Sequence, residues 1–171
     1  MQNNPTPTGN PPPPIEPTGF FTGVQIRPVI VGIVVDYIAT QLAMAAFIFG
    51  YLAKELSKQG EVTEELIQKY MTTTEGLMAA LIIGGLCTAL GGFIAARRAG
   101  VLEIKHGAFV GLGSLILSFI HQAMLEQSMQ LPEWFNFLSI VAVIPAGALG
   151  GYVAAVLKGS GADRRPQRPL S

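Results

Sequence analysis

Four long apolar runs constrain the fold of this chain more than any other feature. They cover about residues 28–52, 76–96, 107–125 and 134–157. A helix rises about 1.5 Å per residue, so about 20 residues are needed to cross the roughly 30 Å hydrocarbon core of a bilayer. Each run meets that length. The sequence therefore predicts an all-α integral membrane protein, a four-helix bundle that spans the lipid bilayer.

The composition supports this prediction and excludes other classes. Hydrophobic residues make up 50% of the chain and charged residues 13%, whereas an ordinary soluble domain has about 25% charged residues. The net charge is zero, so no basic surplus indicates a nucleic-acid partner. The N-terminus has no cationic start followed by an early apolar core, so we expect no cleavable signal peptide and insertion directed by the first span.

The distribution of Lys and Arg predicts the orientation, because cytoplasmic loops are enriched in these residues. With both termini in the cytoplasm, the basic residues on the inner side are Arg27, Arg97, Arg98, Lys105, Lys158, Arg164, Arg165 and Arg168. Those on the outer side are Lys54, Lys58 and Lys69. We therefore expect both termini to be cytoplasmic. Arg97 and Arg98, directly after the second run, are the expected topology-determining pair.

The chain divides into a membrane domain and two tails. Residues 1–26 are rich in proline and are predicted to be a disordered tail. Residues 27–158 form the predicted membrane domain, with an amphipathic segment at about 60–71 on the outer surface. Residues 159–171 are predicted to be a disordered basic tail.

One phrase occurs twice, as ALGGFIAA at residues 89–96 and as ALGGYVAA at residues 148–155. Both copies lie near the inner ends of predicted spans that run from outside to inside. This spacing raises the hypothesis that the bundle consists of two repeated helical hairpins, related by an axis along the membrane normal.

Small residues recur on the faces of the predicted spans. In lipid there is little hydrophobic drive between helices, so small residues promote association by letting backbones approach closely. The expected helix-packing residues are Gly84, Gly91, Gly92, Gly107, Gly111, Gly150 and Gly151. A phosphate-binding role is disfavoured, because the glycine pairs lie near helix C-termini, where the helix dipole repels anions.

Asp36 is the one carboxylate inside a predicted span. A charge near the centre of a spanning helix costs about 2.5–3.5 kcal/mol on insertion scales, so such residues have a structural or functional reason. Thr40 lies on the same helical face, and Thr88 and Ser114 fall at about the same depth when residues are counted from the inner boundary. We therefore predict an intramembrane polar site of Asp36, Thr40, Thr88 and Ser114, with Gln41 and Ser118 as further candidates.

Three roles are open for Asp36. The carboxyl group can be neutral and hydrogen-bonded, fixing the helix register. It can change charge state as part of a proton or cation pathway. It can also contact a partner subunit.

The sequence offers no metal site, cofactor site or catalytic motif. His106 and His121 are 15 residues apart on one predicted helix, over about 20 Å along its axis, so they cannot share a metal ion. We expect both histidines at the membrane interfaces. No nucleophile elbow, zinc-protease motif or phosphate loop is present, so we expect no enzyme activity.

The stretch GGFIAARRAGVLEIKHGAFVGLGSLIL, residues 91–117, resembles a bacterial family of small uncharacterised four-span membrane proteins. In that family a glycine-rich second helix ends in a G-G-aromatic-x-A-A-Arg phrase and the next helix begins with His-Gly. The matching positions here are Gly91, Gly92, Phe93, Ala95, Ala96, Arg97, His106 and Gly107. The resemblance implies four spans in a bacterial cytoplasmic membrane and carries no assigned activity.

The sequence predicts a structural or accessory subunit that packs through its small-residue stripes, in a homo-oligomer or with other membrane subunits. The alternative is a small transporter or a proton or cation pathway that uses Asp36. No small-molecule substrate is indicated by the sequence.

Overall fold

The computed structural model describes residues 19, 21–58, 60–124 and 131–162, and all regular secondary structure in these residues is helical. The long helices are α1 (Ile26–Ala46), α4 (Thr74–Ala99), α5 (Glu103–Met124) and α6 (Glu133–Ala162). Helix α1 continues into a π-helical segment, η1 (Phe47–Leu52), and then into α2 (Ala53–Ser57). The short helix α3 (Glu64–Met71) precedes α4.

Four helical stretches are long and apolar enough to cross a membrane. They are Ile26–Glu55, Thr74–Ala99, Glu103–Met124 and Glu133–Gly159. The predicted all-α fold with four candidate membrane spans is therefore confirmed. Large apolar side chains on all four helices are exposed, such as Leu42, Leu86, Phe119 and Leu149, as expected of surfaces that face lipid.

Local sequence signals set the ends of α4. The hydroxyl of Thr73 accepts a hydrogen bond from the backbone N–H of Gly76 at 3.2 Å, which caps the start of the helix. At the other end Gly100 has a φ of 67°, the left-handed conformation that terminates helices and that glycine adopts without steric cost. The helix can therefore stop at Ala99 and turn directly into α5.

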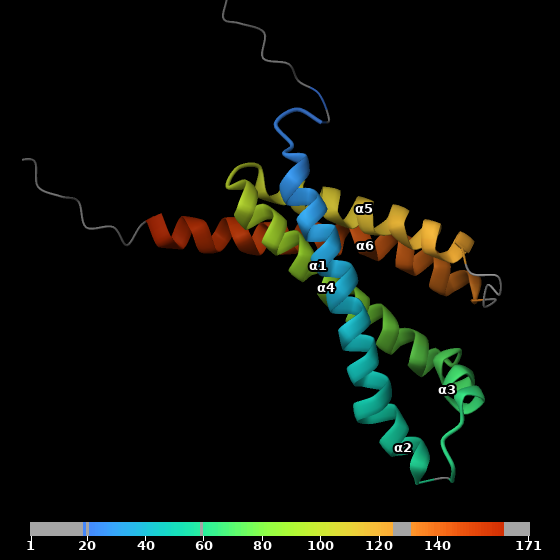
Figure 1. Cartoon of the computed structure of the whole chain (residues 1–171). Helices are drawn as coiled ribbons and strands as arrows, with labels where there is room; N and C mark the ends of the chain where they lie inside the picture. Colours follow the sequence, from blue (N-terminus) through green and yellow to red (C-terminus); the bar gives the residue numbers. More distant parts are fainter. Residues whose placement is uncertain (1–18, 20, 59, 125–130, 163–171) are drawn as a thin grey trace, which may run out of the picture.

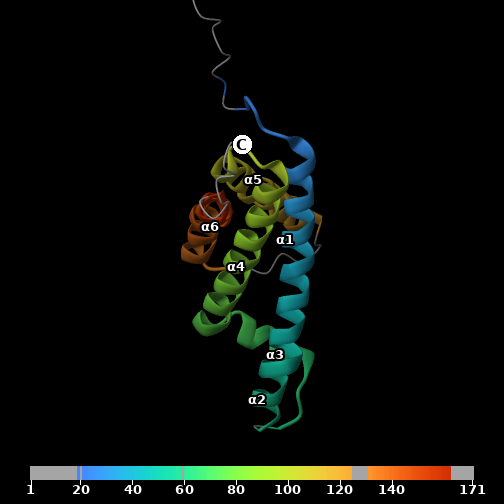
Figure 2. The same cartoon turned by 90° about the vertical axis from the view of Figure 1, so that its left-hand side faces the viewer.

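Helix α4 is central to the arrangement. It packs against α1, α5 and α6, and α5 and α6 pack along each other. Figure 1 shows α1 and α4 running together toward α3, while α5 and α6 run together in a different direction. Figure 2 shows α4 between α1 and α6. The chain thus forms two helix pairs that meet along the C-terminal half of α4, around Gly91 and Gly92, and diverge toward its other end.

Glycines occupy the points where α4 meets α1 and α6. A Cβ atom on Gly91 would lie 2.5 Å from the carbonyl oxygen of Gly32 in α1, and one on Gly92 would collide with the carbonyl of Gly147 in α6. A Cβ on Gly150 would meet the Ala89 carbonyl in the same way. These backbones approach so closely that only glycine fits.

The contact between α5 and α6 is built similarly. A Cβ on Gly107 would collide with the carbonyl of Gly147, and one on Gly151 with that of Glu103. A Cβ on Gly111 would lie 2.5 Å from the carbonyl oxygen of Val143. Gly147, absent from the residues expected from the sequence, therefore serves both α4 and α5.

Gly84, one of the expected helix-packing residues, makes no close contact with another helix. No heavy atom lies within 4 Å of a Cβ built at Gly84. The residue lies beyond the point where the helix pairs diverge. Although small residues recur at every fourth position of α4, this spacing no longer places Gly84 against a neighbouring helix. It lines a cavity instead.

The corresponding glycines of the two repeated phrases have different neighbours. Gly91 meets α1, its own hairpin partner, whereas the matching Gly150 meets α4 of the other hairpin. For the next matching pair the relation is reversed: Gly92 meets α6 of the other hairpin, and Gly151 meets α5, its own hairpin partner. The two-hairpin repeat stays a hypothesis.

The predicted tail boundaries need correction. Residues 21–23 form a turn before α1, and the Lys105 ammonium donates to the carbonyl oxygen of Thr22 at 2.9 Å. Helix α6 extends to Ala162. Ordered backbone therefore reaches beyond the predicted domain at both ends, while the rest of the predicted tails, residues 1–18, 20 and 163–171, lies outside the described residues.

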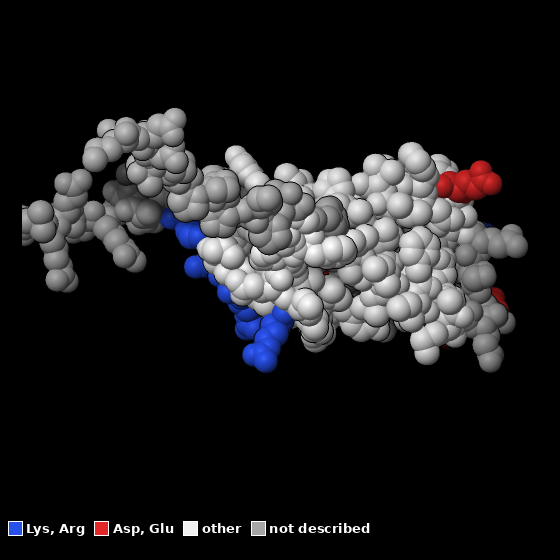
Figure 3. Space-filling model, turned by 90° about the horizontal axis from the view of Figure 1, so that it is seen from above, with Lys and Arg blue, Asp and Glu red and all other residues white. Residues whose placement is uncertain are grey.

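Basic side chains gather at the end where α1 starts and α4 ends. Arg97 and Arg98 are in the last turn of α4, and Lys158 bridges the Gly100 carbonyl oxygen and, at 2.7 Å, Glu103. Figure 3 shows the blue Lys and Arg side chains toward one end of the molecule and red acidic side chains toward the other. The predicted orientation depends only on the Lys and Arg part of this pattern.

Candidate functional site

The Asp36 carboxylate lies between α1 and α4 and is 5% exposed. The Thr88 hydroxyl is 3.2 Å from each carboxylate oxygen. The Thr40 hydroxyl, one turn along α1, donates to Oδ1 at 3.4 Å. The acid is thus buried with two hydroxyl partners, one from its own helix and one from the neighbouring helix.

Close glycine packing holds this pair of helices together at Asp36. A Cβ on Gly91 would lie 2.9 Å from the Cβ of Asp36, in addition to its contact with Gly32. Since Gly91 is three residues after Thr88 in α4, its missing side chain lets the Thr88 hydroxyl reach the carboxylate. The crossing glycines therefore position the polar site.

Ser114 approaches the same carboxyl group from α5. Its Oγ is buried and lies near the Asp36 carboxyl group, outside the distance and angle of a normal hydrogen bond to any described residue. A buried hydroxyl without a partner costs about 1–3 kcal/mol. The four residues predicted as an intramembrane site thus come from three helices to one place, and one of them keeps unused hydrogen-bonding capacity.

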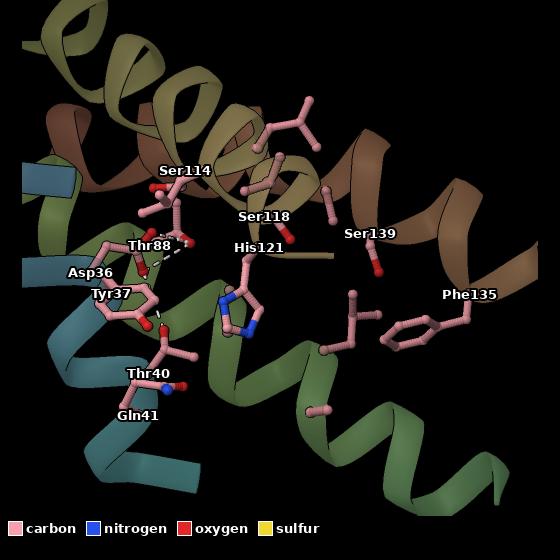
Figure 4. Close-up of a pocket in the computed structure, with 18 residues that line it drawn as sticks. Asp36, Tyr37, Thr40, Gln41, Thr88, Ser114, Ser118, His121, Phe135 and Ser139 are labelled. Atoms are coloured by element: carbon pink, nitrogen blue, oxygen red, sulfur yellow. Dashed lines mark hydrogen bonds between the residues drawn. The ribbon is translucent and has the colours of Figure 1, made fainter. Parts of the chain in front are cut away.

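A cavity of about 290 Å³ extends from Asp36 between the two helix pairs. Its walls come from the later part of α1 and α5 and the earlier part of α4 and α6, the halves that lie toward the predicted outer side. Figure 4 shows Asp36, Thr88 and Thr40 at one side of the cavity and Phe135 at the other. The divergence of the helix pairs is what leaves this space open.

Sequence reasoning missed several residues of the cavity. Tyr37, His121, Phe135 and Ser139 line it, and the Tyr37 and His121 rings are in edge-to-face contact, with centroids 6.5 Å apart. One signal for His121 was present: Ser114, Ser118 and His121 follow i, i+4, i+7 spacing, which places them on one helical face. Gln41 and Ser118, the further candidates, also line the cavity.

His106 is enclosed by protein near the start of α5. Its side chain is completely buried. Its Nε2 accepts a hydrogen bond from the backbone N–H of Gln25 at 2.9 Å, and its Nδ1 is 3.1 Å from the carbonyl oxygen of Leu102. The segment before α1 folds over this face of α5 and covers the ring, while the depth of His106 in the membrane stays a prediction.

The acidic and basic side chains in the cavity wall are few. Among the described residues that line it, Asp36 is the sole acid and none is Lys or Arg. No group of three or more His, Cys, Asp or Glu side chains among the described residues could hold a metal ion. The cavity thus combines one carboxyl group with several hydroxyl groups.

Comparisons with known proteins bring no further information on this arrangement. No protein-family model, curated protein or solved structure matches the chain. The family resemblance of residues 91–117 therefore stays a prediction.

Proposed function

We propose that this protein binds a cation at Asp36 within the membrane, as a small transporter or a proton or cation pathway. The observation that carries the proposal is the position of the Asp36 carboxyl group, buried at one side of a cavity with apolar and polar walls that opens between two diverging helix pairs. A carboxylate needed only to fix helix register requires hydrogen-bond partners and no adjoining space of this size.

The depth of Asp36 and the position of the cavity support this proposal. Asp36 is about ten residues, or about 15 Å, from the start of α1, which places it deep in the predicted span. The cavity is lined by helix halves that lie on the predicted outer side. With both termini in the cytoplasm, as the Lys and Arg distribution predicts, the site would accept its cation from the outer side of a bacterial cytoplasmic membrane.

Flux through reconstituted protein tests this proposal. The protein and its Asp36→Asn variant would be placed in vesicles of zwitterionic and anionic lipid, and uptake of protons, Na⁺ and K⁺ measured under an imposed gradient. Asn keeps the side-chain shape and removes the negative charge, so we expect normal folding with loss of flux. Tyr152→Phe is the matched control, because it removes one polar atom from an exposed position of α6 away from the cavity. Equal flux in all three proteins would contradict the proposal.

A second candidate is a structural or accessory subunit. The observation that favours it is the segment η1–α2, which packs mainly against itself and α1 and exposes Phe49 and Tyr51. The crossing glycines do not supply its interface, since they are used within the chain. If this candidate is right, Asp36→Asn keeps any flux unchanged and substitutions at Phe49 and Tyr51 release a co-purifying subunit.

A further inference from the structure

We propose that the Asp36 cavity binds a protonated organic amine with an apolar body. This inference rests on the proposed function and names the class of cation. The features that carry it are the single buried carboxylate, the hydroxyls around it and the aromatic and apolar walls of the same cavity.

The polar side of the cavity matches an ammonium group. An ammonium donates two or three hydrogen bonds and accepts none. Asp36 provides the counter-charge, and Thr40 and Thr88 place hydroxyl oxygens beside it. Ser114 adds a buried oxygen that makes no normal hydrogen bond to any described residue. Together they offer a charged acceptor and neutral acceptors within one short region.

The remaining walls match an organic body. Tyr37 and His121 form an aromatic pair next to the carboxylate, and Phe135 lies across the cavity. The leucines at positions 81, 115 and 117 contribute apolar surface. Aromatic faces attract cations, and apolar walls with a few convergent polar groups are typical of sites for small organic molecules.

A divalent metal ion fits this cavity less well. Ca²⁺ takes six to eight oxygen ligands and Mg²⁺ six, commonly with several carboxylates, whereas Asp36 is the one acid among the lining residues that the structure describes. The volume of about 290 Å³ lies near the lower end of the range of about 300–1,000 Å³ for pockets that hold organic ligands. A ligand with an apolar part would fill the space next to the carboxyl group, which a single ion would leave empty.

The test compares three probes that share a benzyl group and differ in charge. Benzylammonium carries a positive charge, benzyl alcohol is neutral, and phenylacetate is an anion. The chain has one tryptophan, Trp134, whose ring is 5.9 Å from that of Phe135 in the cavity wall. Its fluorescence, with calorimetry as an independent measurement, reports binding to the full-length protein in lipid nanodiscs.

We expect saturable binding of benzylammonium at least ten-fold tighter than that of benzyl alcohol, and no binding of phenylacetate. In Asp36→Asn the affinity for benzylammonium falls at least ten-fold and that for benzyl alcohol changes little. Tyr152→Phe, the control variant, keeps the preference of the unmodified protein. The comparison of the three probes on the unmodified protein remains decisive if Asp36→Asn fails to fold.

Two results would overturn the inference in distinguishable ways. If benzylammonium binds no better than benzyl alcohol while Na⁺, K⁺ or proton flux depends on Asp36, the amine is the wrong ligand class and the proposed cation function stands. If neither amine binding nor cation flux depends on Asp36, both are wrong.

Discussion

The backbone N–H of Gln25 donates a hydrogen bond to Nε2 of His106, 81 residues away, at 2.9 Å. Because a backbone N–H can only donate, Nε2 must accept and carry no proton. The carbonyl oxygen of Leu102 can only accept, so the proton is on Nδ1. This neutral ring joins the residue that precedes α1 to the first turn of α5, at the end where the basic side chains gather.

We predict that His106→Ala destabilises the protein, because it leaves the Gln25 N–H without its buried partner and opens a cavity. A hydrogen bond contributes about 0.5–1.5 kcal/mol and the cavity adds its own cost, so the free energy of unfolding should fall by at least about 1 kcal/mol. Unfolding of lipid-reconstituted protein by a denaturing detergent measures the change. His121→Ala is the control, since His121 is exposed, and it should lower stability much less. Equal losses of stability in the two variants would argue against the hydrogen bond between Gln25 and His106.

We predict opposite outcomes for two glycine-to-alanine substitutions in α4. Gly92→Ala places a methyl group against the backbone of Gly147, and overpacking of this kind costs about 1–3 kcal/mol. Gly84→Ala meets nothing within 4 Å and should be neutral or stabilise by up to about 1 kcal/mol, since alanine restricts the unfolded chain. Unfolding of the two variants by a denaturing detergent measures the difference in stability. Gly92→Leu should abolish the native packing, and an unchanged fold in that variant would refute the role given to the crossing.

We predict energetic coupling between Asp36 and Thr88. Thr88→Val removes the hydroxyl that reaches both carboxylate oxygens, and should destabilise by about 1–2 kcal/mol. In an Asp36→Ala background the same substitution should cost less by at least about 0.5 kcal/mol, because its partner is already gone. Thr88→Ser keeps the hydroxyl and should recover most of the loss. Additive effects in the double variant would mean that the two side chains do not interact.

We predict that the loop before α4 and the loop after it are on opposite sides of the membrane. Single cysteines at Thr72 and Val101, both exposed, would be introduced into a Cys87→Ser background and treated with a membrane-impermeant maleimide. Intact cells should label the cysteine at position 72, and only permeabilised cells the one at position 101. The reverse pattern would place both termini outside, against the Lys and Arg distribution.

We predict a small contribution from the ion pair of Lys158 and Glu103. Its atoms are 2.7 Å apart, but the Lys158 side chain is 61% exposed, and exposed pairs contribute about 0–1 kcal/mol because water and salt screen them. Lys158→Met should lower stability by no more than that, with a smaller effect at high salt. A loss above about 2 kcal/mol would mean that the bond from Lys158 to the Gly100 carbonyl carries the main effect.

Part of the candidate site could be predicted from the sequence by simple counting. Asp36 is conspicuous because charge is costly in a span, and the fixed helix rise places Thr88 and Ser114 near its depth. The role of Gly84 could not be predicted the same way. It follows the same four-residue spacing as Gly92, and only the crossing of α4 and α6 decides that Gly92 is in contact and Gly84 is open to the cavity.

The sequence by itself determined the four helices, their approximate ends and the presence of one acid inside them, because these depend on local properties: apolar length, helix rise and capping residues. The tertiary structure alone decided that α1 and α4 diverge from α5 and α6, that the space between them joins Asp36 to Tyr37 and His121, and that His106 is buried under the segment before α1. These features depend on how each helix is rotated and crossed against its neighbours. In lipid that choice is made by close contacts between residues far apart in the chain, and a local apolar pattern does not encode it.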